Sequence, residues 1–183
     1  MGWYFSVAQP DDPAGCQEAA ESLRAVARRA RTAEAFLDDQ ASLPNEVFSG
    51  LASQSYRAAS SALATDCRGA SDDTLALAAA LDDYATRLSD VRRTLARIRD
   101  DAVAAGLDVS SVDLVNQVPV PGTEQDAVFR RLDAAAAAAH AEAESAYSAW
   151  WQAVQEHTKG PLPSRTGLPY EPPGPDQHQG DDR

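Results

Sequence analysis

Small and apolar side chains recur along the chain at alternating spacings of three and four residues. The first such series consists of Cys16, Ala19, Leu23, Val26, Ala30, Ala33 and Leu37. This spacing places the side chains on one face of an α-helix, as in coiled coils. Pro13 suits a first helical turn, whereas Pro44 cannot continue a helix because it lacks an amide donor. The pattern predicts a first helix over about 13–42, followed by a turn at Pro44.

A second helix is expected to begin just after that turn, over about 46–68. Its apolar stripe runs through Phe48, Ala52, Tyr56, Ala59 and Leu63. Beyond it, Gly69 and the capping-prone Ser71, Asp72 and Asp73 either end this helix or only kink it. The most regular series comprises Leu77, Leu81, Tyr84, Leu88, Val91, Leu95, Ile98, Ala102 and Ala105. It predicts a helix over about 72–105, with Gly106 at its carboxyl end.

The remaining chain divides into a connector, one more helix and two terminal segments. Val109 to Gly122 is expected to be extended because its prolines exclude a helix. A further series comprises Phe129, Leu132, Ala136, Ala139, Ala143, Ala146, Trp150 and Ala153. It predicts a helix over about 123–158, so that 13–158 forms one helical domain. Residues 1–12 form an aromatic amino-terminal segment, and the Pro- and Gly-rich tail 159–183 is expected to be disordered.

The predicted fold class is all-α. The chain has 183 residues, of which 44% are hydrophobic but only 7% aromatic, and much of the apolar content is alanine. Such side chains suit helices that pack closely. The helices should therefore form an elongated antiparallel hairpin or bundle of three to four long helices.

The charge balance excludes several classes of partner. The formal net charge is −12, which repels nucleic-acid phosphates and anionic lipid headgroups. No run of eighteen apolar residues is present, and the amino terminus lacks the pattern of a secretory signal peptide. We therefore expect neither nucleic-acid binding nor classical export.

The predicted turn resembles that of a known family. Leu43-Pro44, Phe48-Ser49-Gly50 and the alanines and Tyr56 that follow are similar to the turn of the WXG-type helical hairpins exported by type VII secretion systems. The long Arg- and Ala-rich helix beyond it resembles the actinobacterial secretion-signal domain that precedes many polymorphic toxins. Phe48 stands where the family usually has tryptophan. A large ring can still fill the mouth of the hairpin, while Gly50 permits close approach of the backbone.

The resemblance implies a function and a set of partners. The chain would be a type VII secretion substrate, or the secretion-targeting helical domain of a toxin-type protein, that works by helix–helix recognition. Pro44, Phe48, Gly50 and Tyr56 would form the hairpin joint. The implied partners are a second helical-hairpin protein or a second copy of the chain, and the ATPase of the export machinery. The implied localisation is secreted, without a classical signal peptide.

One departure from the family favours a different function. The family's export signal places Asp or Glu four residues after a tyrosine, and no tyrosine in this chain has an acid at that position. The nearest substitute is Phe129 with Asp133, which share one face of a helix. The alternative interpretation is that Phe129 is a core residue and Asp133 a solvated charge. The alternative function is a cytoplasmic helical adaptor or immunity-like binding protein that is not exported.

No pattern in the sequence points to catalysis. The histidines are scattered, the paired aspartates are adjacent and so do not share a helix face, and no phosphate-binding loop or nucleophile motif occurs. We expect no enzyme activity, cofactor, metal site or small-molecule substrate. Trp150 and Trp151 point about 100° apart on a helix, so one can pack inward while the other contacts a partner.

The two cysteines leave two interpretations open. In an antiparallel hairpin that turns near Pro44, Cys16 should lie level with about residue 72, which is about 7 Å along the axis from Cys67. A disulfide therefore requires the helix boundaries to differ from those predicted by a few residues. Otherwise both thiols are small core side chains.

The composition of the tail leads to a first prediction. Residues 159–183 contain too little apolar surface to offset the entropy lost on ordering. Limited proteolysis of the isolated protein, followed by mass spectrometry, should trim the chain back towards Lys159 and leave the helical domain intact. Resistance of residues 161–183 to protease would contradict the expectation that the tail is disordered.

Overall fold

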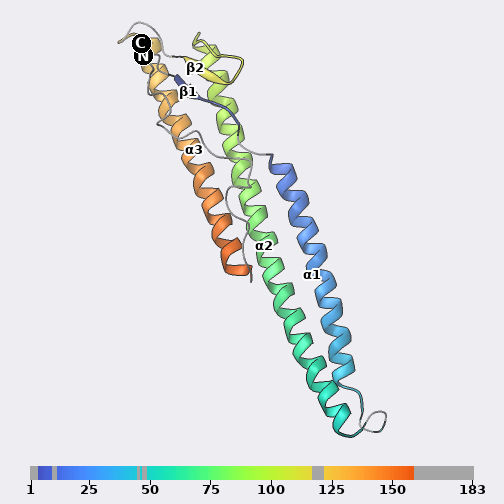
Figure 1. The fold of residues 1–183 in the computed structure, drawn as a ribbon. Coiled ribbons are helices and arrows are strands. Elements are labelled where there is room, and N and C mark those ends of the chain that lie inside the picture. Colours follow the sequence, from blue (N-terminus) through green and yellow to red (C-terminus); the bar gives the residue numbers. More distant parts are fainter. Residues whose placement is uncertain (1–3, 10–11, 45, 47–48, 117–121, 159–183) are drawn as a thin grey trace, which may run out of the picture.

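The computed structural model describes residues 4–9, 12–44, 46, 49–116 and 122–158. In the order of the chain these form β1 (Tyr4–Ser6), α1 (Pro13–Ala41), α2 (Leu51–Ala104), β2 (Leu114–Asn116) and α3 (Glu124–His157). The fold is all-α with three long helices, as the sequence predicts. Figure 1 shows α1 and α3 running antiparallel to α2, each along a different part of its length.

Helix α2 is continuous where the sequence suggested two helices, over 46–68 and 72–105. A break at Ser71 would need its side chain to cap backbone amides. Instead its hydroxyl donates to the carbonyl oxygen of Ala27 in α1 at 3.2 Å. Asp72 pairs with Arg31 at 2.6 Å, and Asp73 contacts His157 at 3.0 Å. These contacts to neighbouring helices use the polar groups that would otherwise cap a new helix.

The helix ends have identifiable causes. Asp12 caps α1 by accepting from the amide of Ala14, and Pro13 occupies the first turn. Thr123 accepts from the amide of Asp126, whose own carboxylate accepts from the amide of Gly122. These two bonds, which resemble a capping box but use the amide before the N-cap residue, start α3. At the end of α2, Gly106 has a φ of +71°, which glycine adopts without steric cost.

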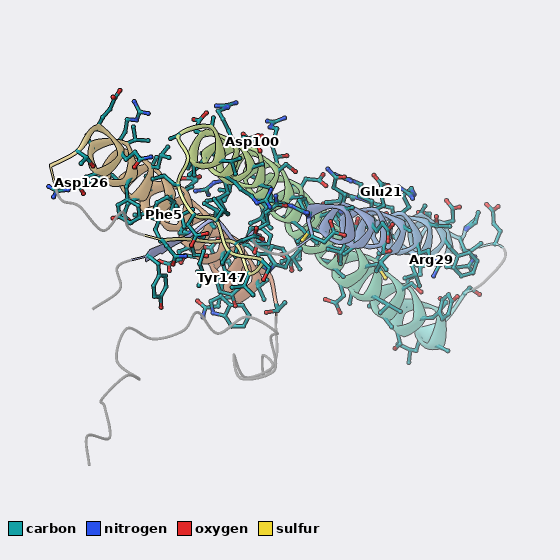
Figure 2. All side chains as sticks on the ribbon, turned by 90° about the horizontal axis from the view of Figure 1, so that it is seen from above. Phe5, Glu21, Arg29, Asp100, Asp126 and Tyr147 are labelled. Carbon is teal, nitrogen blue, oxygen red and sulfur yellow. The ribbon has the colours of Figure 1, made fainter. Side chains whose placement is uncertain are left out.

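A small antiparallel sheet at one end of the bundle was not predicted. Phe5 of β1 pairs with Val115 of β2, and Val7 continues the pairing with a hydrogen bond to Asp113. The Phe5 ring lies 5.2 Å from that of Phe129, and Figure 2 shows Phe5 beside the helices at this end. The described residues within 1–12 and 109–122 lie outside the helices, as predicted. The strands were not predicted because three residues carry no detectable periodicity.

Three levels can be distinguished along α2. At the first, β1, α2 and α3 enclose the main core, which contains Phe5, Val7, Val91, Leu95, Ile98, Ala102, Leu107, Val115, Phe129, Leu132, Ala136 and Ala139. At the second, Ala20 of α1 joins Leu81, Leu88 and Ala146. At the third, α3 has ended, and α1 and α2 are the only described elements that continue to the turn (Figure 1).

The contact between α1 and α2 uses mainly small side chains. The buried residues are Ala20, Ala27 and Glu34 of α1, and Ser53, Ser60, Ala64, Ser71 and Ala78 of α2. The predicted seam of α1 is therefore wrong in part, because Val26 and Ala33 are exposed while the heptad that includes Ala27 is buried. Small side chains let the two helix backbones approach closely, so larger residues lie at the sides of the contact.

This packing leads to a prediction about the seam. Ala27→Leu should lower the free energy of unfolding by about 1–3 kcal/mol, because the extra methyl groups have no space between the helices. Val26→Leu, at the adjacent exposed position, should change it by less than about 0.5 kcal/mol. Urea unfolding followed by circular dichroism measures both. Equal effects at the two positions would contradict the close packing.

Candidate helix-docking surface

The joint between α1 and α2 is longer than predicted. Ser42 follows α1, and α2 begins only at Leu51, after Gly50. Pro44 is exposed in this connection, whereas Phe48 lies outside the described residues, so its proposed role stays a prediction.

Gly50 has a conformational role that the sequence did not indicate. Its φ of +97° with ψ of −178° is a backbone conformation open almost only to glycine. A Cβ atom added there would meet no atom of the described residues within 4 Å. Glycine is therefore required for the conformation of the chain entering α2, and its role in close backbone approach stays a prediction.

Tyr56 lies on the surface near this joint. Its ring is 42% exposed, and its hydroxyl donates to the side-chain oxygen of Gln40 at 3.2 Å. This bond links the last turn of α1 to the first turns of α2.

The apolar stripe predicted for the start of α2 exists, but it is not buried. We call this surface the open stripe. It consists of Ala52, Tyr56, Ala59, Leu63, Asp66 and Ala70, all of which are exposed. At 100° per residue the open stripe lies about 100° around α2 from the side that contacts α1. It therefore flanks the α1–α2 contact instead of forming it.

The opposite flank of the same contact is occupied by ion pairs. Arg24 pairs with Asp82, Arg31 with Asp72, and Arg68 with Asp38. Among the described residues, the ion pairs that join α1 to α2 lie on this flank or in the seam itself. The two sides of the hairpin thus differ in chemistry: one is polar and crosslinked, and the other is mainly apolar.

Glu34 occupies the seam between these flanks. Its carboxylate accepts from Arg68 at 2.5 Å and from Arg31 at 2.9 Å. The hydrogen bond from Arg68, followed by that from Arg31, holds the pKa of Glu34 below its usual value, and the same contact raises the pKa of Arg68. Sequence reasoning missed this residue because its partner is 34 positions away along the chain.

An open groove begins where α3 approaches its end. It has a volume of about 560 Å³ and lies between α1 and α3, with α2 at its base. Val26, Leu77, Leu81, Trp150 and Val154 are among its lining residues. Trp150 also packs against the core cluster around Leu88, while Trp151 is half-buried.

Phe129 and Asp133 have separate environments. The Phe129 ring is buried against Phe5, and Asp133, one turn further along α3, is exposed. This is the arrangement of a core ring and a solvated carboxylate. A role for the pair as an export signal stays a prediction.

Cys16 and Cys67, both of which the structure describes, are not joined by a disulfide. Cys67 directly precedes Arg68, which contacts Glu34 of α1, so Cys67 lies about level with Glu34. Glu34 is eighteen residues beyond Cys16 on α1. At 1.5 Å per residue the two cysteines are therefore about 27 Å apart along the hairpin. The predicted alignment of Cys16 with residue 72 was wrong because the connection between the helices extends to Gly50.

The part of the chain that the structure describes contains no group of three or more His, Cys, Asp or Glu residues arranged to hold a metal ion. None of its helices carries an apolar stretch long enough to cross a bilayer. Comparison with protein-family models, curated proteins and solved structures found no match. The surface that stands out is the open stripe with the adjoining groove.

The contacts of Glu34 lead to a prediction about pH. Because the pKa of Glu34 is lower in the folded protein, its ionised form adds stability that is present above pH 4.5 and is lost as the pH falls through the folded-state pKa. Glu34→Gln should therefore be less stable than wild type at neutral pH, and this difference should shrink below pH 4.5.

The matched control is Asp38→Asn, because Asp38 is half-exposed and 3.5 Å from Arg68. An exposed pair of this kind contributes little, so the control should follow wild type more closely. Chemical unfolding at a series of pH values measures both variants. A difference between Glu34→Gln and wild type that does not change with pH would contradict the assignment.

Proposed function

We propose that this chain is a type VII secretion substrate, or the secretion-targeting helical domain of a toxin-type protein, and that it acts by helix–helix recognition. The observation that carries the proposal is the hairpin of α1 and α2, which projects beyond α3 and exposes the open stripe. A surface of this kind suits an amphipathic helix as its ligand. The turn with Pro44 and Gly50, which resembles that of WXG-type hairpins, supports the assignment to export.

The partners proposed are helical. A second helical-hairpin protein or a second copy of the chain would contact the hairpin, and the ATPase of the export machinery would recognise the assembled surface. The groove at Trp150 can receive a large apolar side chain from such a partner. No catalytic step, cofactor or nucleic acid enters this proposal.

A second candidate is a cytoplasmic helical adaptor or immunity-like protein that uses the same surface. The observation that favours it is the lack of any tyrosine followed four residues later by an acid. The two candidates differ in localisation, so export distinguishes them.

The test compares release of the chain into the medium by cells with an intact type VII system and by cells that lack its ATPase. The neighbouring helical-hairpin gene, where one is present, is co-expressed. The protein should appear in the medium only when the ATPase is intact. Equal retention in both cells would exclude export and leave the adaptor.

Variants at two glycines locate the function in the joint. Gly50→Val forces a β-branched residue into a left-handed conformation and should reduce export, because it displaces the start of α2. Gly69→Val is the matched control, since Gly69 lies within α2 and has no atom within 4 Å of an added Cβ. Phe48→Trp introduces the residue usual in the family and should leave export intact. Equal loss in both valine variants would contradict a specific role of the joint.

A further inference from the structure

The carboxyl end of α3 forms one wall of the apolar groove between α1 and α3. Trp150, Val154 and Thr158 are each about one helical turn apart and all line the groove. At 1.5 Å per residue they extend over about 12 Å. None of the described residues that line the groove is charged, and all except Ser22 and Thr158 are apolar. The groove is therefore a short apolar surface that ends where α3 ends (Figure 1).

The chain leaves α3 at the edge of this groove. Thr158, the residue after the helix, has a φ of −107° and a ψ of 119°, which is an extended conformation. Its side chain is half-buried, and its hydroxyl donates to the carbonyl oxygen of Val154 at 2.5 Å. The ring of His157 contacts Asp73 of α2 at 3.0 Å, which holds the end of α3 against the hairpin. The tail, residues 159–183, therefore starts at the groove itself.

The first residues of the tail have a sequence that suits such a groove. Pro161, Leu162 and Pro163 place one large apolar side chain between two prolines. Prolines favour the extended polyproline II conformation, which rises by about 3.1 Å per residue, so residues 160–163 would span about 12 Å. Segments of this kind bind in grooves lined by aromatic side chains, because little conformational entropy remains to be lost. Gly160 allows the chain to reverse after Thr158.

We propose that the tail of this chain occupies the groove through Pro161, Leu162 and Pro163. After a reversal at Gly160 these residues run antiparallel to α3, and the Leu162 side chain packs against Trp150. Only three residues separate Leu162 from Thr158 at the edge of the groove. A connection this short gives the occupant an effective concentration in the millimolar range.

The distribution of charge supports this segment as the occupant. The chain has a formal net charge of −12, and the four acids of the tail all lie at or beyond Glu171. Residues 159–165 carry Lys159 and Arg165 and no acid. Positive side chains are stabilised near the carboxyl end of a helix, where free carbonyl oxygens give a partial negative charge. The part of the tail that is nearest to the groove along the chain is thus also the part that the acidic molecule repels least.

The tail contains a second Leu-Pro dipeptide, at Leu168 and Pro169. Leu168 follows Gly167 instead of a proline, so more conformational freedom is lost when it binds. It is also six residues further from α3, which lowers its effective concentration at the groove. Leu162 is therefore the favoured occupant, and Leu168 provides a matched control.

The proposed contact is weak and reversible. One leucine in an open groove binds with low affinity, so at a millimolar effective concentration the groove is occupied for roughly half of the time. A protease cleaves the tail during the other half, and the cleavage rate falls by only about twofold. The predicted trimming towards Lys159 is therefore unchanged.

The indole N–H signals in the NMR spectrum of the full chain test the contact. The chain has 3 tryptophans, and replacing each in turn with phenylalanine assigns their signals. Leu162→Asp should shift the Trp150 signal, because the charged side chain leaves the groove, whereas Leu168→Asp should not. A Trp150 signal that does not respond to Leu162→Asp, or that responds equally to both variants, overturns the proposal. A wild-type signal that moves with protein concentration assigns the groove to a second copy and also overturns it.

Disulfide formation within one chain tests the location of the contact. In a chain with Cys16→Ser and Cys67→Ser, Val26→Cys places a thiol in the groove. Arg28→Cys places one at an exposed position about 200° around α1 at almost the same level. Each is combined with Leu162→Cys and oxidised at low protein concentration. The pair with Val26→Cys should close at least about fivefold faster. Equal rates overturn the proposed location.

The contact rests on the proposed function in one consequence only. A helical partner that inserts a side chain at Trp150 must displace Leu162, so the tail and the partner compete for the groove. The two tests use the isolated chain, so their outcomes are independent of export. Export of a chain whose Trp150 signal ignores Leu162→Asp leaves the proposed function and removes the tail contact. A chain that passes both tests but is retained in the cell leaves the tail contact and removes export.

Discussion

The close contact between α1 and α2 depends on small side chains, and the other surfaces of the molecule follow from it. Ala27 and Ser71 meet where a larger residue would hold the helices apart. The larger apolar residues of both helices are consequently placed beside the contact. Where α3 is present it covers one face of α2, and where α3 has ended the continuation of that face is exposed as the open stripe (Figure 1). The length of α3 thus decides which part of one continuous apolar face is core and which part is surface.

The same contact makes the molecule unequal in stability along its length. Near β1 the core contains Leu95, Ile98 and Phe129, each of which contributes roughly 1.5–3 kcal/mol when buried. The projecting end buries alanines, serines and the Glu34 carboxylate, whose apolar area is much smaller. Local opening should therefore begin at the joint, and a partner that binds the open stripe would stabilise the end that needs it most.

The sequence allowed the helices to be located because their ends carry strong local signals. Pro13, Pro44 and Gly106 act on the backbone directly, and they bracket helices close to the observed α1 and the end of α2. Burial was harder to predict. In α3 and the second part of α2 the apolar series is the buried one, but in α1 the buried heptad contains Ala20, Ala27 and Glu34. Hydrophobic periodicity identifies the face with the largest side chains, whereas a close two-helix contact selects the smallest.

Four residues of the candidate surface, Ala52, Tyr56, Ala59 and Leu63, were predicted as a stripe, but the environment of this surface was not. Tyr56 and the alanines around it were recognised as a stripe, yet their exposure depends on where α3 ends, which no local pattern records. Ser71 likewise looked like a cap, because its acceptor, the carbonyl of Ala27, lies 44 residues away. The clamp on Glu34 has the same origin, since a buried charge is stable only when tertiary structure brings its partner.

The net charge of −12 limits how strongly the open stripe can hold any partner that is also acidic. Long-range repulsion between two such chains slows their approach and is screened by salt, whereas the apolar contact itself is not. A modest interface under such repulsion forms and dissociates readily, because most differences in affinity lie in the dissociation rate. The small side chains that bring α1 and α2 together therefore also determine which surface the hairpin exposes: a mainly apolar stripe of fixed length, on one side only.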